Sequence, residues 1–433
     1  MAPAALAWMG MLQGVELPTR NFRYVDLGCG QGFNLVLLAA SHPESEFVGV
    51  DFMPNHVDHG RKLAKAAGLT NVQFVEADFT RLASGQECLN DLQGQRLDGR
   101  VEYVVAHGIA TWVAPEVREA LWSVAGRLLA PGGVHYTSYN TLPGWLPVLP
   151  FQHLILQYQA RGLSGVNAIK KAQATLAAME ASRSSLQSAF PTLKNRLEAA
   201  AKLDPAYLTQ EYNNTYWQPQ FVVDMMSAAG RHKLSFLGSA TLPELFDGLL
   251  PPSVLKVMNE EPDRILREGL RDLGIHQSFR RDVYVRGHNP VWPGRRGQIA
   301  LAARAISLPT LRLPEAVEGK LDLNTPLGKL RIDHAVVQQT LELLQRPEGA
   351  SIAEVMAVTG ETRVADVAQR VSLMMHSGWV APLLGASGHQ AAALNRCIVD
   401  KGVQIPPGER IGFDRVRDAE RFTVSEAGVV VIG

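Results

Sequence analysis

Short apolar runs alternate with amphipathic segments through the first third of the chain. Five runs have the length and β-branched content of buried strands, near 23–27, 46–50, 72–76, 101–106 and 133–139. Residues 115–129 show a helical pattern that begins at a proline and ends before a Pro-Gly-Gly sequence. This alternation predicts an α/β fold whose parallel sheet is doubly wound by helices.

The first of these strands leads into a glycine-rich turn. Asp26 is followed by Gly28, Gly30 and Gly32, where the absence of side chains lets backbone N–H groups approach a ligand. The spacing is G-x-G-x-G rather than the G-x-G-x-x-G of dinucleotide-binding proteins, and the chain has no G-x-x-x-x-G-K-[ST] phosphate loop. The turn therefore predicts a nucleotide-type pocket without a dinucleotide.

Two further strands end in acidic residues. Asp51 follows the first glycine by about 20 residues, the spacing of a carboxylate that accepts hydrogen bonds from ribose hydroxyls. Asp78 follows the third strand, where it can accept a hydrogen bond from an exocyclic amine. Together with Asp26 these positions fit an amino acid, a ribose and an adenine.

This pattern resembles class I S-adenosylmethionine (SAM)-dependent methyltransferases. The resemblance implies that Asp26 faces the methionine moiety, Asp51 the ribose and Asp78 the adenine amine. SAM is then the expected cofactor. The expected cofactor-binding residues are Asp26, Gly28, Cys29, Gly30, Gly32, Asp51, Phe52, Asp78, Phe79 and His107.

A class I sheet closes with one more helix, a sixth strand and an antiparallel seventh strand. Residues 141–220 do not supply these elements, and the stretch 150–202 is rich in Ala, Leu, Gln and Lys, which favours an inserted helical segment. The missing elements follow as a helix at 221–229 and strands at 233–238 and 277–286. We therefore expect a seven-stranded sheet that closes around a helical insertion.

A Pro/Gly-rich linker at 287–294 precedes a different pattern. The remainder has the order strand, helix, helix, helix, strand, with the helices at 333–344, 351–359 and 364–377 and the last strand in 378–383, and this order resembles a winged helix. The third helix carries only two basic residues, which favours packing or protein contact over DNA binding. A strand pattern at 429–432 predicts a C-terminal edge, and no internal repeat is evident. The expected domains are a SAM-binding core at 1–149, a helical insertion at 150–220, completion of the sheet at 221–290 and a winged-helix-like domain at 296–433.

Composition narrows the possible partners. The 42 Lys and Arg residues balance 42 Asp and Glu residues, so nothing in the net charge favours nucleic acid. The three cysteines, Cys29, Cys88 and Cys397, are too scattered for a disulfide framework or a metal site. No stretch reaches the roughly 18 apolar residues of a membrane span. We expect a cytoplasmic protein with no metal.

The segments that leave the fourth and fifth strands carry unusual motifs. A-H-G stands at 106–108 with T-W at 111–112, and S-Y-N-T stands at 138–141 with P-G-W at 143–145. Together with the segments 210–219 and 279–286, they resemble bacterial methyltransferases with a methyltransferase regulatory domain, including lysine methyltransferases of outer-membrane proteins. The resemblance covers about residues 1–290, and it implies a protein or peptide substrate.

Methyl transfer requires a nucleophile that lies in line with the activated methyl group. His107 stands where many N-methyltransferases carry [DNS]-P-P-[YF]; it could accept a proton, bind the cofactor carboxylate or fix the turn. Strand alternation predicts that Tyr139 faces the methyl group, with Asn140 beside it and Tyr212 completing the site. Such hydroxyl and amide groups, with desolvation, could orient a lysine amine and lower its pKa. The expected catalytic residues are Tyr139, His107, Asn140 and Tyr212.

These observations favour a SAM-dependent methyltransferase that N-methylates a side-chain amine or amide of a protein or peptide. One alternative is a small-molecule methyltransferase of secondary metabolism, because the same fold methylates O, N and C nucleophiles. Another is a SAM-binding regulatory protein that signals through the winged helix. The Leu/Ala-rich insertion predicts a homodimer.

Overall fold

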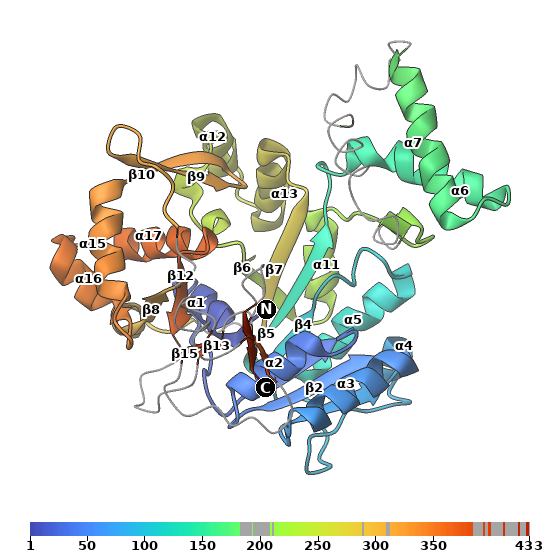
Figure 1. Ribbon diagram of the computed structural model, residues 1–433, viewed down its shortest axis with the longest axis horizontal. Helices are drawn as coiled ribbons and strands as arrows, with labels where there is room; N and C mark the ends of the chain where they lie inside the picture. Colours follow the sequence, from blue (N-terminus) through green and yellow to red (C-terminus); the bar gives the residue numbers. More distant parts are fainter. Residues whose placement is uncertain are drawn as a thin grey trace.

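The computed structural model describes residues 1–181, 193, 208–209, 212–287, 290–308 and 312–383, and five short strands between 393 and 432. A seven-stranded sheet forms the centre of the molecule, with helices on both faces (Figure 1). Its strands are β1 (Arg23–Leu27), β2 (Glu46–Asp51), β3 (Val72–Glu76), β4 (Val101–Ala106), β5 (Leu129–Asn140), β6 (Leu234–Ser239) and β7 (Phe279–Arg286).

The strand order is β3-β2-β1-β4-β5-β7-β6. Strands β1 to β5 pair in parallel, whereas β7 lies antiparallel to both β5 and β6. The sequence-based expectation of a doubly wound sheet with an antiparallel seventh strand is therefore confirmed. The carboxyl ends of β1, β2, β4 and β5 meet at one edge, where this type of sheet binds ligands.

Two hydrophobic layers cover the sheet. One joins inward residues such as Tyr24 and Phe47 to α1 (Pro3–Leu12), α2 (Phe33–Ser41) and α3 (Pro54–Ala66). The other joins residues such as Val25 and Val48 to α4 (Phe79–Ser84), α5 (Pro115–Leu128) and α11 (Val222–Arg231). Neighbouring residues of one strand thus enter opposite layers, as the two-residue period of a strand requires.

Strand β5 begins earlier than the sequence predicts. The Pro-Gly-Gly sequence at 131–133 was expected to separate helix from strand, but α5 passes directly into β5 at Leu129. The register with β4 shifts between Val101 and Tyr103, so the extra residues form an irregularity in the pairing. Gly132, with φ of 84°, provides the backbone conformation that this irregularity needs.

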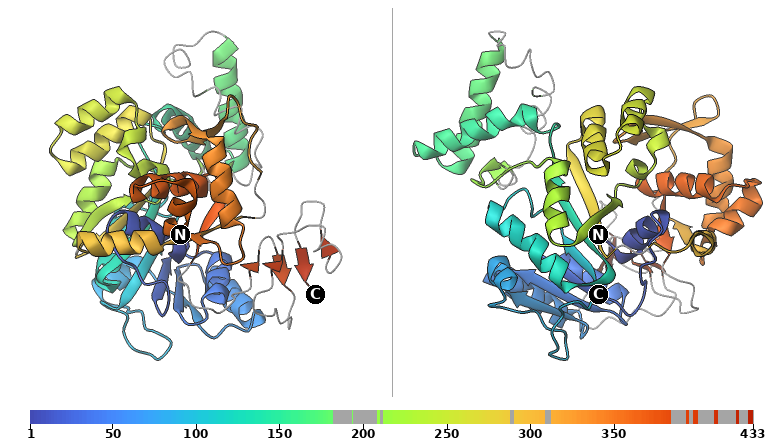
Figure 2. Two further views of the ribbon diagram at one scale, coloured as in Figure 1. Left: turned by 90° about the vertical axis from the view of Figure 1, so that its left-hand side faces the viewer. Right: turned by 180° about the vertical axis from the view of Figure 1, so that it is seen from behind.

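The helical insertion lies apart from the sheet. Its described helices are α6 (Leu149–Ala160) and α7 (Gly165–Ala181), which follow the short 3-10 helix η1 (Leu146–Val148). The two helices pack on each other through their own apolar cluster and project away from the rest of the molecule (Figures 1 and 2). Most of the remaining expected insertion, 182–192 and 194–207, lies outside the described residues.

The chain between the insertion and β7 supplies η2 (Leu242–Leu245), η3 (Asp247–Leu249), α12 (Pro252–Glu260) and α13 (Arg264–Ile275). The C-terminal region then contains α14 (Pro293–Ala302), β8 (Arg304–Ser307), β9 (Lys320–Thr325), β10 (Gly328–Asp333), α15 (His334–Leu344), β11 (Ala350–Ser351), α16 (Ile352–Thr359), α17 (Val364–His376) and β12 (Val380–Leu383). The last short strands are β13 (Ala393–Leu394), β14 (Cys397–Val399), β15 (Arg410–Ile411), β16 (Thr423–Val424) and β17 (Val430–Ile432).

The three expected helices α15, α16 and α17 and the following strand β12 are present. Strand β8 pairs with both β11 and β12, whereas the hairpin of β9 and β10 was not anticipated. The winged-helix comparison itself stays a prediction. Helix α1 packs against this region, and Trp8 Nε1 donates a buried hydrogen bond of 2.9 Å to Ser372 Oγ. The first helix therefore ties the sheet to the C-terminal region.

No helix in the described ranges is long and apolar enough to cross a membrane.

Candidate cofactor and methyl-transfer site

The glycine turn is fixed to the neighbouring strand. The N–H groups of Gly28 and Cys29 donate to the Val50 carbonyl at 2.7 and 3.1 Å. Gly28 and Gly32 have φ of 81° and 78°, which side chains rarely adopt. A Cβ atom on Gly32 would lie 2.4 Å from the Phe74 ring, so packing alone requires glycine there.

Gly30 differs from the two flanking glycines. Its φ is 55°, but a Cβ atom on it would meet no protein atom within 4 Å. The space in front of Gly30 is therefore open toward the sheet edge. A glycine that protein packing does not require fits close approach of a ligand to the backbone.

Asp51 connects this turn to β2. Its Oδ2 accepts a hydrogen bond from Gly30 N–H at 2.9 Å, and its Oδ1 accepts one from Met53 N–H at 2.9 Å. The carboxylate is 6% exposed, whereas the adjacent Phe52 ring is 68% exposed. Carboxylate oxygens have further lone pairs, so Asp51 can still accept from a ligand. A buried acceptor beside an exposed aromatic ring matches the expected ribose position.

Asp26 lies at the end of β1 and is also 6% exposed. The pKa of Asp26 is raised to about 7. Burial is the main cause, the N-terminal amino group opposes the shift and the negative charge of Asp51 adds to it. A bound cation would favour the ionised form of such a carboxyl group. Asp26 is therefore suited to hold an ammonium group.

Asp78 caps the N-terminus of α4. Its Oδ1 accepts from Thr80 N–H at 2.7 Å and from the Thr80 hydroxyl at 2.6 Å, and these bonds lower the pKa of Asp78. The side chain is exposed and ionised, as a hydrogen-bond acceptor for an amine must be. Phe79, by contrast, is 7% exposed and packs in the core, so only its backbone could contact a cofactor.

The Cys29 side chain also turns away from the expected pocket. Its Sγ lies close to Gly49 of β2, where an added Cβ atom would be 2.9 Å away. Burial raises the pKa of the thiol well above its usual range. Cys29 can therefore contribute its backbone to a ligand, but not a thiolate.

His107 follows β4 and is held by two residues of β5. Its Nδ1 lies 3.1 Å from the Tyr136 hydroxyl and 3.0 Å from Ser138 Oγ. Ser138 Oγ accepts from Gly108 N–H at 2.9 Å, so its own proton is free to go to Nδ1. Burial, assisted by the positive N-terminus and Arg281, lowers the pKa of His107 to about 4. The low pKa favours a neutral ring, and a proton on Nε2 is the tautomer in which Nδ1 accepts from the Ser138 hydroxyl.

The structure contradicts the expected position of Tyr139. Its side chain is 0% exposed, and its hydroxyl donates a hydrogen bond to Asp282 Oδ2 at 2.5 Å. The ring belongs to the layer that includes α11, opposite the side on which Tyr136 and Ser138 meet His107. The prediction that Tyr139 faces the transferred methyl group is therefore wrong. Ser138, one position earlier along β5, lies on the side of the sheet that carries His107.

Asn140 belongs to a network between motifs. Its N–H donates to Thr111 Oγ1 at 2.8 Å, and its carbonyl accepts from Gln220 N–H at 3.0 Å.

The segment before α11 also bonds to the segment after β4. Gln218 N–H donates to the Thr111 carbonyl at 2.8 Å, and Asn214 Nδ2 donates to the Trp112 carbonyl at 2.8 Å. The three motif segments after β4, after β5 and before α11 thus form one hydrogen-bonded unit beside His107.

Tyr212 lies in the core of the insertion. Its ring is 8% exposed and packs edge-on against Phe151, with 5.2 Å between ring centroids. This placement does not support the expectation that Tyr212 completes an open catalytic site.

Sequence reasoning missed three residues that do surround His107. They are Tyr136, Ser138 and Arg281, of which Arg281 is the direct cross-strand partner of Ser138. Burial raises the pKa of Tyr136 to about 12, and Arg281 opposes this shift. Tyr136 and Ser138 are two residues apart and therefore share the face of β5 that meets His107, but no pattern in the sequence distinguishes this face from the opposite one.

Within the described part of the chain, no group of three His, Cys, Asp or Glu side chains could hold a metal ion. The site therefore consists of carboxylates, backbone N–H groups, hydroxyls and a neutral imidazole.

Comparisons with known families agree with this geometry. Residues 25–133 match a methyltransferase domain, and residues 204–286 match a "predicted methyltransferase regulatory domain". The sheet order, the glycine turn and these matches define a class I SAM-dependent methyltransferase. More narrowly, the chain combines a methyltransferase domain with a region that matches the regulatory-domain family.

Curated relatives extend over much of the chain. An uncharacterized protein of Synechocystis, sll1526, is 31% identical over 350 residues, which are 80% of this chain and 66% of that protein. An uncharacterized protein of Rickettsia prowazekii, RP789, is 26% identical over 280 residues, which are 64% of this chain and 48% of that protein. The chain thus spans between about half and two thirds of the length of these relatives.

Solved structures share the fold. PKMT2 from Rickettsia typhi in complex with AdoHcy is 20% identical, with a TM-score of 0.66, and the match covers 88% of this chain and 75% of that chain. PKMT2 from Rickettsia typhi in a second structure gives a TM-score of 0.68 at 18% identity, over 98% and 81% of the two chains.

The C-terminal segment has a different relationship, which the sequence interpretation did not anticipate. Residues 383–432 match a "GlmU-like, C-terminal hexapeptide" family. A glucose-1-phosphate adenylyltransferase of Deinococcus deserti is 65% identical over 40 residues, which are 9% of this chain and 10% of that protein. This segment, of which five short strands are described, should be separated from the expected winged-helix-like domain.

Proposed function

We propose that the protein transfers a methyl group from SAM to a side-chain amine or amide, lysine-like, of a protein or peptide. The observation that carries the proposal is the turn at Gly30, which is linked to Asp51 and opens onto unfilled space. The protein substrate is suggested by the family motifs at 106–112 and 138–145.

The residues around the turn fit the parts of SAM. Asp26, whose pKa burial raises to about 7, would pair with the ammonium group of the methionine moiety. Asp51 would accept from the ribose hydroxyls, and the exposed Asp78 from the adenine amine. SAM supplies a methyl group on a sulfonium that is already activated, so the protein has to orient the acceptor and exclude water.

His107 is better suited to donate a hydrogen bond than to accept a proton. Its Nδ1 is occupied by the hydroxyls of Tyr136 and Ser138, and its low pKa shows that burial disfavours the imidazolium. The Nε2–H is then the group that can bind the cofactor carboxylate or an acceptor carbonyl. An amine substrate must enter the site neutral or lose its proton to solvent, since no base on β5 faces the site in this arrangement.

We also propose a cytoplasmic homodimer. Support comes from the insertion, which stands away from the sheet (Figure 2). On its helix α7, the Met179 side chain is 47% exposed. Such a projecting apolar surface suits a self-complementary interface. Light scattering that finds a monomer at micromolar concentration would refute the dimer.

The decisive experiment for the function is SAM turnover followed by mass spectrometry. A panel of lysine-containing and glutamine-containing peptides is incubated beside free amines of similar size. Methylated peptides and unmodified free amines are the expected result. Methylation of free amines alone would indicate a small-molecule enzyme, and SAM binding without transfer to any acceptor would indicate a regulatory protein.

A further inference from the structure

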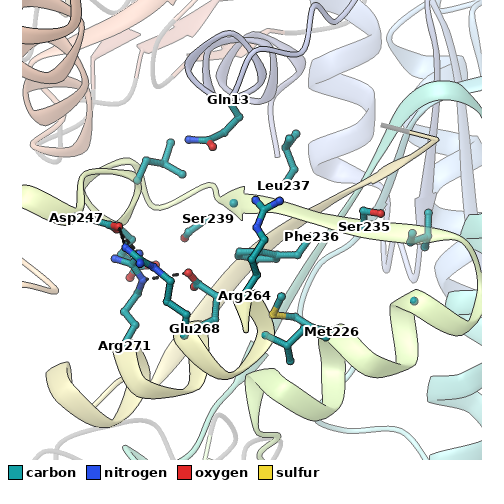
Figure 3. Close-up of a pocket in the computed structure, with 17 residues that line it drawn as sticks. Gln13, Met226, Ser235, Phe236, Leu237, Ser239, Asp247, Arg264, Glu268 and Arg271 are labelled. Carbon is teal, nitrogen blue, oxygen red and sulfur yellow. Dashed lines mark hydrogen bonds and ion pairs between the residues drawn. The ribbon is translucent and has the colours of Figure 1, made fainter. Parts of the chain in front are cut away.

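A cavity of about 450 Å³ opens along β6, at the opposite end of the sheet order from β3 (Figure 3). All six residues of β6 line it, together with residues of α11, α13 and the loop between β6 and α12. Apart from Gln13, every lining residue lies within 204–286, the part of the chain that matches the regulatory-domain family. The cavity is distinct from the cofactor site, which lies beyond β7 and β5.

Strand β6 is an edge strand of the central sheet. Its sheet partner is β7, and among the strands that the structure describes none pairs with the backbone N–H and C=O groups on its other side. Unpaired edges of this kind accept an additional extended segment, whose backbone completes the ladder. The cavity along this edge offers room for such a segment, although α11 and η2 also contact the strand.

The cavity lining carries three arginines and three acidic side chains, which differ in how they are paired. Arg267 pairs with Asp247 at 2.6 Å, and Arg271 pairs with the same carboxylate and with Glu268. Arg264, which extends from α13 toward the strand in Figure 3, makes no ion pair with any residue that the structure describes. One arginine at the groove is therefore available to a carboxylate from outside the chain.

The remaining lining is mixed, with apolar side chains beside Gln13, Ser235, Ser239 and Glu244. Met226, Phe236, Leu237 and Leu245 lie along it. An occupant that suits all three features is extended, offers apolar side chains at alternate positions and carries an acidic side chain opposite Arg264.

We infer that the groove binds an extended acidic segment of the methyl-accepting protein, which adds as a strand beside β6. This inference rests on the proposed function. Strand β7 is antiparallel to both neighbours, so β5 and β6 run in the same direction and end at the same sheet edge. With strands about 4.8 Å apart, an added strand lies roughly 15 Å from β5, which about five extended residues can span. One substrate chain can therefore occupy the groove and present an acceptor side chain near His107.

The test uses a fluorescein-labelled peptide of about ten residues that alternates valine and glutamate and continues into a lysine-containing tail. Fluorescence anisotropy without SAM measures its affinity for the full chain. Arg264→Glu should weaken binding by about tenfold or more, and a peptide with lysine in place of each glutamate should prefer the variant. The substitution places an acid in the first turn of α13, where it does not disfavour the helix.

Arg363→Glu is the matched control. Arg363 precedes α17 and its side chain is 76% exposed, so this variant has the same charge change outside the groove and should bind like wild type. Hydrogen exchange supplies the second measurement, because the β6 amides that do not face β7 should become protected only when the peptide is bound. Equal affinity of wild type and Arg264→Glu, or no protection of these β6 amides in a saturated complex, would overturn the inference.

Methyl transfer separates this inference from the proposed function. If both hold, Arg264→Glu raises KM for the long peptide, leaves kcat unchanged and does not alter KM for a peptide that lacks the acidic segment. Transfer with no dependence on Arg264 would leave the function standing and remove the docking groove. Groove binding without transfer to any acceptor would remove the function and, with it, the assignment of the occupant as a substrate.

Discussion

The Tyr139 hydroxyl and the Asp282 carboxylate are hydrogen-bonded partners, 2.5 Å apart, and both side chains are 0% exposed. They join β5 to β7 in the interior, where Arg280 Nε also donates to Asp282 at 2.8 Å. Burial raises the pKa of Asp282, and Arg280 and Tyr139 oppose that shift. Tyr139 thus helps an otherwise costly buried carboxylate to remain in the fold.

Tyr139→Phe should consequently affect stability more than catalysis. Removing one donor from a buried carboxylate costs about 1–3 kcal/mol of unfolding free energy. Urea denaturation measures this loss, and turnover per folded molecule should stay within about twofold of wild type because the ring volume is kept. A stable Tyr139→Phe variant with greatly reduced turnover would return Tyr139 to the catalytic site. Tyr136→Phe is the comparison, because Tyr136 contacts His107.

Gly30→Ala tests whether a ligand fills the open space at the turn. Because its Cβ atom would meet no protein atom, the substitution should cost only the roughly 1–2 kcal/mol of a left-handed backbone conformation. SAM affinity, measured by calorimetry, should nevertheless fall by about tenfold or more if the cofactor approaches this backbone closely.

Gly32→Ala is the contrasting substitution. Its Cβ atom would collide with the Phe74 ring, so the variant should lose about 2–4 kcal/mol of stability, from overpacking and backbone strain together.

For the Gly30 prediction, the contradicting result is a folded Gly30→Ala protein with unchanged SAM affinity, which would show that the cofactor does not use the open space.

The sequence predicted most of the sheet because its strands are bounded by clear chemical signals. Asp26 is the last but one residue of β1 and Asp51 is the last residue of β2, and both acids are brought to one sheet edge as expected. The face of β5 could not be predicted in the same way. Its last eight residues are all buried, so polar and apolar positions do not alternate with exposure. Tyr139 and Tyr136 look equivalent until the neighbouring layers are known.

Other differences have related causes. The Tyr212 ring packs on Phe151, a contact between segments about 60 residues apart that no local pattern encodes. The sequence predicted one strand before the first C-terminal helix, whereas the structure has a hairpin of two short strands with charged residues, β9 and β10. The motifs at 106–112 and 138–145 marked the right region, since their backbones are hydrogen-bonded into one unit, but they did not reveal which side chains face the ligand.

Asp51→Asn should weaken SAM binding by about 1.5–3 kcal/mol, the value of a hydrogen bond to a charged acceptor. The amide has one acceptor oxygen where Asp51 uses two for Gly30 and Met53, so one N–H of the turn would face an NH₂ group. Calorimetric titration measures the loss. Asp58→Asn is the control because Asp58 is an exposed partner of Lys62 on α3, and it should bind SAM like wild type.

His135 should make stability fall at acid pH. It is 1% exposed, packs against Trp122 and has its pKa lowered to about 4 by burial, although a hydrogen bond with the Val104 carbonyl opposes the shift. The unfolded chain, with a pKa near 6.5, binds the proton more readily. The contribution is therefore complete above pH 6.5 and is lost as the pH falls toward 4.

The measurement for His135 is a difference between proteins, since other groups titrate in the same range. Relative to His135→Phe, wild type should lose about 2 kcal/mol of unfolding free energy between pH 7.5 and pH 5. Burial raises the pKa of Asp26 and Asp272 to about 7, and these groups act in the opposite direction in both proteins. A difference that does not change with pH would show that His135 titrates normally.

His107 gives the clearest distinction between a donor and a base. With Nδ1 held by Tyr136 and Ser138 and a pKa of about 4, the ring should stay neutral from pH 6 to pH 8. His107→Gln retains an N–H donor, so SAM affinity and turnover should fall by only a few-fold, whereas His107→Phe, which has no donor, should weaken SAM binding by about tenfold. If His107 instead removed the substrate proton, both variants would lose about 10²-fold or more in kcat, and the profile of kcat/KM would show an ionisation in the histidine range. Single-turnover rates and SAM titrations on the same preparations, from pH 6 to pH 8, decide between these outcomes.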